Sequence, residues 1–380
     1  MRRYLFCVNI LKLCSNNVKM KTFIYEISIS LCIAILQSKT SFSSGLTTRS
    51  YTKSWQNKPG QHSIQESETK IFKSQLLGTH ENSSVRECQN CIVYVNGDYL
   101  PAQEAKISVL DRGFMFADSV YEVTAVLAGK LLDNDYHVAR LHRSLNELNI
   151  PAPFVSDHEL LKIQQEVIAR NHLQEGLIYL QASRGPVSER DFLFPSCPDP
   201  TLVVIPQHKG VIKSSLADRG ARVITVEDIR WGRRDIKTTQ LLAQSMAKQA
   251  AYLAGVDDAW LFETDTGHVT EGSSANAYIL THDNCLITRN LGNDILPGIT
   301  RRVVLSLAHE YDDIKLVVER PFTVEEALQA KEAFSTSSTS FVMPVVEIDG
   351  NPIGNGEPGP VAIKLRQLYI EHALSNSSRM

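Results

Sequence analysis

The chain has 380 residues, of which 43% are hydrophobic and 21% are charged. This length and composition are typical of a globular protein with a sizeable core and about two domains. The net charge of -3 lacks the basic excess with which proteins bind nucleic acid or anionic lipid, so we expect neither as a partner.

Seven cysteines are present, at positions 7, 14, 32, 88, 91, 197 and 285. Their spacing implies no disulfide framework. Cys88 and Cys91 form a single CxxC, which is half of a zinc site, but the sequence has no second CxxC or spaced pair of histidines to complete four ligands. We therefore predict no metal site.

Residues 1–65 have an unusual composition, with nine Lys and Arg residues, many Ser and Thr, and one acidic residue, Glu26. This composition resembles an organelle transit peptide and predicts the mitochondrial matrix or another organelle; without import the protein would be cytoplasmic. The apolar run 23–36 is interrupted by Glu26 and is too short to anchor the chain in a membrane, although a secretory signal or a disordered extension remains an alternative. Residues 66–90 are polar and predict a linker.

The expected folded part begins near Cys91. Apolar residues at 92–95, followed by Asn96-Gly97, predict a β-hairpin. A strand is expected at 120–127, and apolar residues spaced as in a helix follow from His137. Ser156 or Asp157 caps a predicted helix to about residue 171, and further strands are expected at 177–181 and 201–205.

The second half opens with a predicted strand at 222–226. A helix is expected from Thr238, with Leu241, Leu242, Met246, Ala250 and Leu253 facing the core and Gly255 ending it. Strands are expected at 259–262, 269–270 and 277–280, a capping box at Thr323 and Glu326, and a late hairpin around 345–350. Strands dominate with helices between them, so we predict an α+β fold with mixed sheets in two domains, 91–212 and 213–375.

Four features of this second half carry chemistry. Lys237 stands where an extended segment is expected to give way to a helix, which makes it a candidate nucleophile. Glu271 ends a strand before a turn rich in hydroxyl residues. Pro297-Gly298-Ile299-Thr300 opens a helix whose first amides suit a phosphate, and the hydroxyl run Thr336 to Ser340 follows a strand and offers further donors.

The order of these features resembles that of the class IV aminotransferases, which are pyridoxal phosphate enzymes of fold type IV. The resemblance covers about residues 91–375. Within the class, the segments 118–123, 137–141 and 235–237 are most similar to D-amino-acid transaminases. The resemblance implies the exchange of an amino group between a D-amino acid such as D-alanine and a 2-oxo acid such as 2-oxoglutarate, with pyridoxal 5'-phosphate as cofactor and a homodimer as the assembly.

The resemblance also assigns roles to residues. Lys237 is the catalytic lysine, which holds the cofactor covalently and moves a proton. Glu271 binds the pyridine nitrogen, and Arg140 binds the phosphate. The remaining cofactor-binding candidates are Asn276, Ile299, Thr300, Ser338 and Thr339, and the substrate-binding candidates are Tyr121, Arg190 and Phe192.

Phe192 departs from the family pattern, because better-known members carry His at that position of the loop. The substrate range therefore stays open at this point, and a solvated Arg190 paired with Glu189 or Asp191 is the alternative to a substrate clamp. At the level of function, the alternatives are a branched-chain L-amino-acid transaminase, an aminodeoxychorismate lyase and a non-catalytic binding module with the same fold.

Overall fold

The computed structural model describes residues 91–377, with side chains to residue 375. These residues belong to one compact unit, Thr79–Met380. The expected import sequence, the linker and Cys88 of the CxxC pair lie outside the described residues, so these expectations stay predictions.

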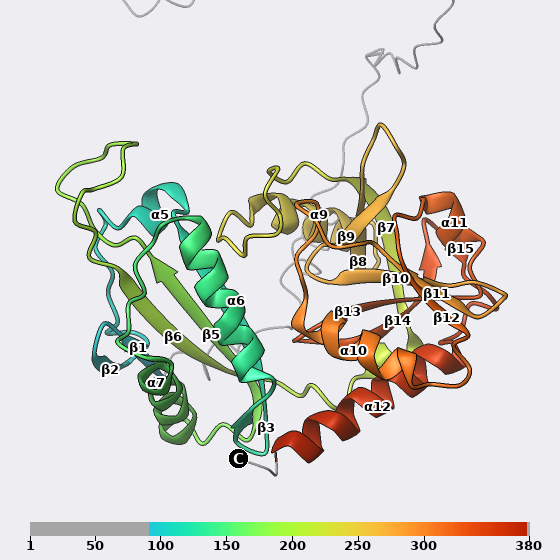
Figure 1. The fold of residues 1–380 in the computed structure, drawn as a ribbon, viewed down its shortest axis with the longest axis horizontal. Coiled ribbons are helices and arrows are strands. Elements are labelled where there is room, and N and C mark those ends of the chain that lie inside the picture. The colour runs from blue at the N-terminus through green and yellow to red at the C-terminus, as the bar shows by residue number, and fades with distance from the viewer. Residues whose placement is uncertain (1–90, 378–380) are drawn as a thin grey trace, which may run out of the picture. The chain divides into compact units, whose positions relative to one another are not determined.

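The first sheet is six-stranded, entirely antiparallel, and has the strand order β2-β1-β6-β5-β3-β4 (Figure 1). The expected Asn96-Gly97 hairpin is confirmed, with Tyr94 opposite Tyr99. The strands are β1 (Ile92–Val95), β2 (Asp98–Pro101), β3 (Ser119–Leu127), β4 (Lys130–Leu131), β5 (Glu175–Ser183) and β6 (Thr201–His208).

Two helices, α6 (Asn134–Glu147) and α7 (Asp157–Arg170), cover one face of this sheet. Leu141 of α6 and Leu160 of α7 share a buried cluster with Val120, Leu180 and other residues of β3, β5 and β6. The Ser156 hydroxyl accepts a hydrogen bond from the Glu159 amide, which confirms the predicted start of α7. The short helix α5 (Arg112–Phe116) precedes β3.

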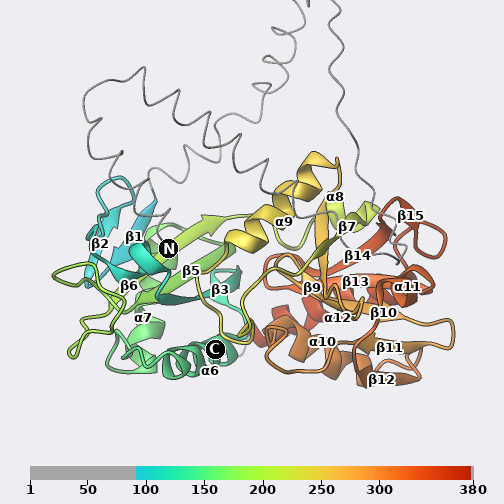
Figure 2. The same cartoon turned by 90° about the horizontal axis from the view of Figure 1, so that it is seen from above.

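The second sheet has nine strands in the order β12-β11-β10-β13-β14-β7-β8-β9, with β15 beside β14 (Figure 2). It mixes parallel pairs, such as β7 with β8 and β11 with β12, with antiparallel ones, so the α+β fold with a mixed sheet is confirmed. The strands are β7 (Ala221–Glu227), β8 (Asp258–Phe262), β9 (Val269–Gly272), β10 (Asn276–Leu280), β11 (Cys285–Thr288), β12 (Leu316–Glu319), β13 (Glu332–Ser337), β14 (Phe341–Ile348) and β15 (Asn351–Pro352).

Helices from the second half pack on both sides of this sheet. The largest buried cluster joins α10 and α12 to β10, β13 and β14, while α11 and α9 pack in separate clusters. The predicted capping box of Thr323 and Glu326 is present at the start of α11. The helices are α8 (Ser215–Arg219), α9 (Leu242–Leu253), α10 (Ile299–His309), α11 (Val324–Leu328) and α12 (Pro360–Ser377). The chain changes sheets between β6 and β7, and the division into domains at residue 212 stays a prediction.

The helix expected from Thr238 differs from the prediction in both start and orientation. It begins at Leu242, because the preceding residues pair with β3 instead: the Thr239 amide donates to the Ser119 carbonyl, and the Lys237 carbonyl accepts from the Tyr121 amide. Its buried side chains are Ala247 and Ala251, whereas Leu242 and Leu253 are each 75% exposed and Met246 is also exposed. The predicted inward face of this helix was therefore wrong.

Candidate active site

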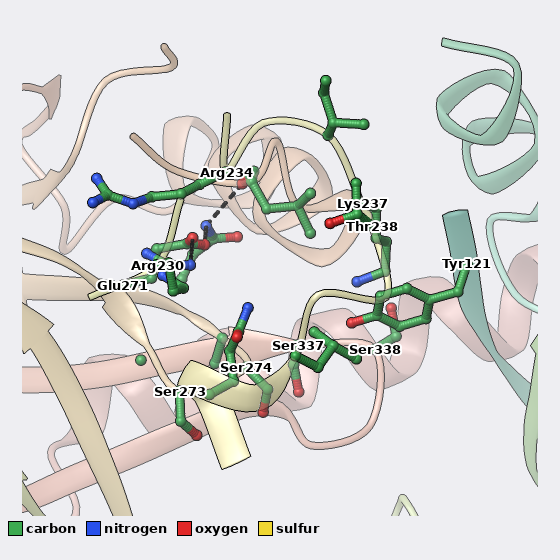
Figure 3. Close-up of a pocket in the computed structure, with 18 of the residues that line it drawn as sticks. Tyr121, Arg230, Arg234, Lys237, Thr238, Glu271, Ser273, Ser274, Ser337 and Ser338 are labelled. Carbon is green, nitrogen blue, oxygen red and sulfur yellow. Dashed lines mark hydrogen bonds and ion pairs between the residues drawn. The ribbon is translucent and has the colours of Figure 1, made fainter. Parts of the chain in front are cut away.

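A pocket of about 310 Å³ lies where the start of β3 meets the segment before α9 (Figure 3). This volume is at the lower end of the range for small-molecule sites. The predicted site residues that line it are Tyr121, Arg140, Lys237, Glu271, Asn276, Ile299, Thr300 and Ser338. Residues separated by more than two hundred positions in the chain thus meet in one cavity.

Lys237 lines the pocket together with both of its neighbours, Ile236 and Thr238. The Thr238 amide donates to the Ile236 carbonyl at 2.9 Å, so the backbone makes a tight turn at Lys237. The amine of Lys237 lies 4.3 Å from the centroid of the Tyr121 ring, and Figure 3 shows the two side chains adjacent. The Arg143 guanidinium donates to the Asp235 carbonyl at 2.8 Å and also binds its carboxylate, which holds the segment in place.

Glu271 lies at the end of β9 and is fully enclosed. Its Oε1 accepts from Arg230 at 2.5 Å, and its Oε2 accepts from the Asn276 amide at 3.1 Å. Burial raises the pKa of Glu271, and the charge of Arg230 together with its hydrogen bond opposes that rise. Glu271 is thus a buried carboxyl whose charge depends on Arg230.

Sequence reasoning did not identify Arg230 or its second partner, Asp228. Arg230 donates to both oxygens of Asp228, at 2.9 and 2.7 Å, and the Thr270 hydroxyl donates to the same carboxylate at 2.6 Å. Both carboxyl groups and the guanidinium are buried. The opposite charges of Asp228 and Arg230 were the only signal in the sequence for this network. Such a pair is also typical of a solvated turn, and only the position of β9 beside it shows that the pair is buried.

Arg140, on α6, lines another part of the pocket through a second buried charge network. It binds Glu122 of β3 through Nε at 2.8 Å and Nη2 at 2.7 Å, and it donates to the Pro297 carbonyl at 2.9 Å. Burial alone would raise the pKa of Glu122, but the charge and hydrogen bonds of Arg140 and a hydrogen bond with His137 bring it to about 2. Burial lowers the pKa of His137. Arg140 is therefore locked in place next to the start of α10.

The first turn of α10 faces the same pocket, since Gly298, Ile299 and Thr300 all line it. The N-cap residue is Gly298, which has no side chain to accept hydrogen bonds from the first amides of the helix. A Cβ at Gly298 would lie 2.1 Å from Oδ1 of Asn276, so only glycine permits this close approach. The amides and the positive end of the helix dipole are thus available to an anion.

The predicted hydroxyl run lies at the hairpin between β13 and β14. Thr336 and Ser337 belong to β13, and both line the pocket together with Ser338. Thr339 is not among the lining residues; its hydroxyl lies 3.1 Å from that of Ser337. The hairpin thus offers hydroxyl donors beside α10 and Arg140.

Arg190 and Phe192 do not line the pocket of their own chain. The Arg190 guanidinium lies 5.0 Å from the Phe116 ring and 5.1 Å from the Phe192 ring, and Phe192 is 74% exposed. The structure therefore brings together Tyr121 and the predicted cofactor-binding residues other than Thr339, but it holds the predicted clamp on a separate loop.

These residues fit pyridoxal phosphate at both of its ends. A phosphate would meet the amides of Ile299 and Thr300, the Ser338 hydroxyl and Arg140. A pyridine nitrogen would meet a buried carboxylate, Glu271, and an aldehyde needs a primary amine such as that of Lys237. The donor set therefore matches the cofactor implied by the resemblance.

Comparison with known proteins agrees with this geometry. The family model described as Amino-transferase class IV matches residues 119–348. The chain belongs to the class IV aminotransferases. As a member of this class, the chain is an aminotransferase that depends on pyridoxal phosphate, and its substrates are small molecules.

Among curated proteins, the D-alanine aminotransferase of Staphylococcus aureus (strain MSSA476) is 35% identical over 287 residues, which cover 75% of this chain and 99% of the relative. That of Bacillus licheniformis is 35% identical over 292 residues, 76% of this chain and 99% of the relative. Among solved structures, the branched-chain aminotransferase of Thermoproteus uzoniensis with norvaline has a TM-score of 0.66 at 27% identity, and the match covers 75% of this chain and 95% of that one.

Among residues 91–377, none of the helices combines the length and the apolar character needed to cross a membrane.

Proposed function

We propose that this chain is a D-amino-acid transaminase that uses pyridoxal 5'-phosphate to exchange an amino group between a D-amino acid, such as D-alanine, and a 2-oxo acid, such as 2-oxoglutarate. One observation carries the proposal: the amine of Lys237 enters the same pocket as the buried Glu271–Arg230 pair and the anion-binding end formed by Arg140 and α10. The curated relatives at 34–36% identity, all named D-alanine aminotransferase, support the choice of substrate class.

In this proposal Lys237 is the acid and base of the reaction. When bound, pyridoxal phosphate supplies a ring that accepts the electrons left on the substrate α-carbon. The Lys237 amine takes the proton from the substrate α-carbon and delivers it to the cofactor carbon. The Tyr121 ring, whose centroid lies 4.3 Å from the amine, limits the directions from which the amine can approach.

Glu271 supplies the negative charge that keeps a ring nitrogen protonated. Because burial raises its pKa, the carboxylate form depends on Arg230, which donates at 2.5 Å. Asn276 donates to the other oxygen, so the carboxylate is oriented as well as charged. We therefore assign Arg230 to the support of Glu271 rather than to the substrate.

The substrate carboxylate needs a positive partner, and we propose that Arg190 supplies it across the interface of a homodimer. The position of Arg190 outside the pocket lining of its own chain supports this arrangement. Exposed apolar side chains on α5, α9 and the Arg190 loop also support a contact with a second copy, because such a contact would remove their apolar surface from water. They are Phe114, Leu193, Leu242, Met246 and Leu253.

The function is tested by assaying the purified chain, loaded with pyridoxal phosphate, on D-alanine and on L-leucine with 2-oxoglutarate as acceptor. We expect turnover of D-alanine, and we expect Lys237→Ala to abolish both turnover and the visible absorbance of the bound cofactor. Preference for L-leucine would make the chain a branched-chain transaminase. Elimination of pyruvate from added aminodeoxychorismate, with no turnover of either amino acid, would make it a lyase. Bound cofactor with no turnover of any amino acid would leave only a binding module.

The homodimer is tested by coexpressing Lys237→Ala with Arg190→Ala chains that carry different tags. In a mixed dimer, one pocket combines an intact Lys237 with the partner's intact Arg190. If Arg190 acts across the interface, random pairing restores about a quarter of the wild-type sites. If Arg190 serves its own chain, no pocket in the mixture is complete and activity stays at the level of the two variants.

A further inference from the structure

The loop that carries Arg190 is held by a row of guanidinium groups and aromatic rings that alternate. The Arg184 guanidinium lies 3.7 Å from the ring centroid of Phe194. The Arg112 guanidinium lies between two rings, 5.4 Å from the centroid of Phe194 and 4.8 Å from that of Phe116. Arg190 continues the row between Phe116 and Phe192, as described above, and these two rings lie 5.4 Å apart. Each contact is within the distance at which a cation is attracted to a ring face.

A buried carboxylate anchors one end of this row. Asp118 accepts from Nε of Arg112 at 2.7 Å and from Nε and Nη2 of Arg184 at 2.8 and 3.0 Å. Arg184 also donates to the carbonyls of Leu148 and Asn149, at 2.7 and 2.8 Å. Arg112 and Arg184 are almost completely buried, so both are immobile compared with an arginine on the surface.

Arg112 connects this anchor to the loop backbone. Its Nη1 donates to the carbonyls of Asp191 and Leu193, at 2.7 and 3.1 Å, and its Nη2 donates to that of Phe192 at 3.2 Å. The three carbonyls immediately follow Arg190 in the chain. One buried side chain thus fixes the backbone that directs both Arg190 and Phe192.

We infer that Arg112 is a positioning residue for the Arg190 carboxylate clamp, and that Phe116 and Phe192 set the plane of its guanidinium. The inference rests on the proposed function of Arg190. An exposed arginine has many rotamers, so it loses conformational entropy when it binds a ligand. Contacts with two rings restrict its rotamers before the ligand binds and therefore reduce this entropy loss. At position 192, where better-known members carry His, the phenylalanine ring thus replaces the polar side chain by stacking on the Arg190 guanidinium.

The contribution of the ring is tested with Phe192→Leu, which keeps an apolar side chain and removes the ring. The matched control is Leu316→Ala, which trims an exposed apolar side chain, 57% exposed against 74% for Phe192, on the edge strand β12 of the second sheet. We expect Phe192→Leu to raise KM for D-alanine by about 2- to 5-fold, the factor that a single exposed cation–π contact provides, with kcat unchanged. Equal effects of the two substitutions would overturn the role of the ring.

The role of Arg112 is tested with Arg112→Lys, which keeps the charge but cannot reach Asp118 and three carbonyls at once. We expect KM for D-alanine to rise on the order of tenfold, with little change for an amine that lacks a carboxylate. The control is Arg170→Lys, because Arg170 also lies over a ring, that of Tyr99 at 4.4 Å, and binds Glu166, but is remote from the loop. A parallel loss with both amines would mean general damage to the fold and would overturn the positioning role.

A second measurement does not depend on activity. Local unfolding of a loop increases its cleavage by proteases, so we expect trypsin to cut Arg112→Lys after Arg190 several-fold faster than it cuts the wild type or Arg170→Lys. Unchanged cleavage would show that Arg112 does not hold the loop. If the wild-type chain turns over no D-amino acid, the proposed function fails, and the cleavage comparison still decides whether Arg112 holds the loop.

Discussion

Arg230 is the residue whose removal should most change the electrostatics of the pocket. Its guanidinium binds Glu271 at 2.5 Å and Asp228 at 2.7 Å, and the side chains of all three are at most 7% exposed. Arg230→Met keeps an apolar stem and deletes the charge. Asp228 then keeps Thr270 and the more distant Arg234, at 3.4 Å, whereas Glu271 loses the guanidinium that favours its charged form.

The magnitude follows from the burial of these groups. Removing one partner of a buried ion pair typically costs about 3–5 kcal/mol, and we expect Arg230→Met to lower the free energy of unfolding by about that amount. Burial raises the pKa of Glu271 and Arg230 opposes the rise, so the pKa of Glu271 increases further in the variant. The carboxyl is neutral below this pKa and charged above it. The stability loss should therefore be smallest at acid pH, grow as pH rises from the wild-type pKa of Glu271 to the higher pKa of the variant, and level off above it.

The assay is urea unfolding of both proteins at a series of pH values. Arg230→Lys keeps the positive charge but loses the bidentate geometry of the guanidinium, so its free energy of unfolding should lie between those of the wild type and Arg230→Met. The control is Arg320→Met, because Arg320 pairs with Glu326 at the surface, where both side chains are more than 40% exposed and ion pairs contribute little. A loss below about 1 kcal/mol, as for a surface pair, or a loss independent of pH, would refute the reasoning.

Four further predictions concern the site and the front of the chain. Glu271→Gln should leave the fold intact and slow proton transfer, because a neutral amide does not stabilise a protonated ring nitrogen; an unchanged single-turnover rate would place that nitrogen elsewhere. Arg190→Ala should reduce kcat/KM for D-alanine by the equivalent of about 2–5 kcal/mol and spare an amine without a carboxylate, whereas equal losses for both would exclude Arg190 as the clamp. Gly298→Ala should weaken the binding of pyridoxal phosphate, measured by equilibrium dialysis, because its Cβ would lie 2.1 Å from the Asn276 side chain. Residues 1–85 fused to a fluorescent protein should direct it to an organelle, and a diffuse cytosolic signal would contradict the import prediction.

Local patterns in the sequence were sufficient for those features that depend on neighbouring residues. The Asn96-Gly97 hairpin, the Thr323 capping box and the start of α10 were predicted correctly, because each arises from backbone preferences and hydrogen bonds within a few residues. The order of Lys237, Glu271 and the Gly298 turn also identified the family, since that order is a property of the chain itself.

Only the tertiary structure decided the features that depend on distant partners. Helix α9 starts late because Lys237 and Thr239 form hydrogen bonds with β3, more than a hundred residues earlier in the chain, and its apolar face lies outward because small alanines pack on β8. The pairing of Arg230 with Glu271 likewise required β9 beside the Lys237 segment. Hydrogen bonds and charges act through space, so their partners could not be read from periodicity along the chain.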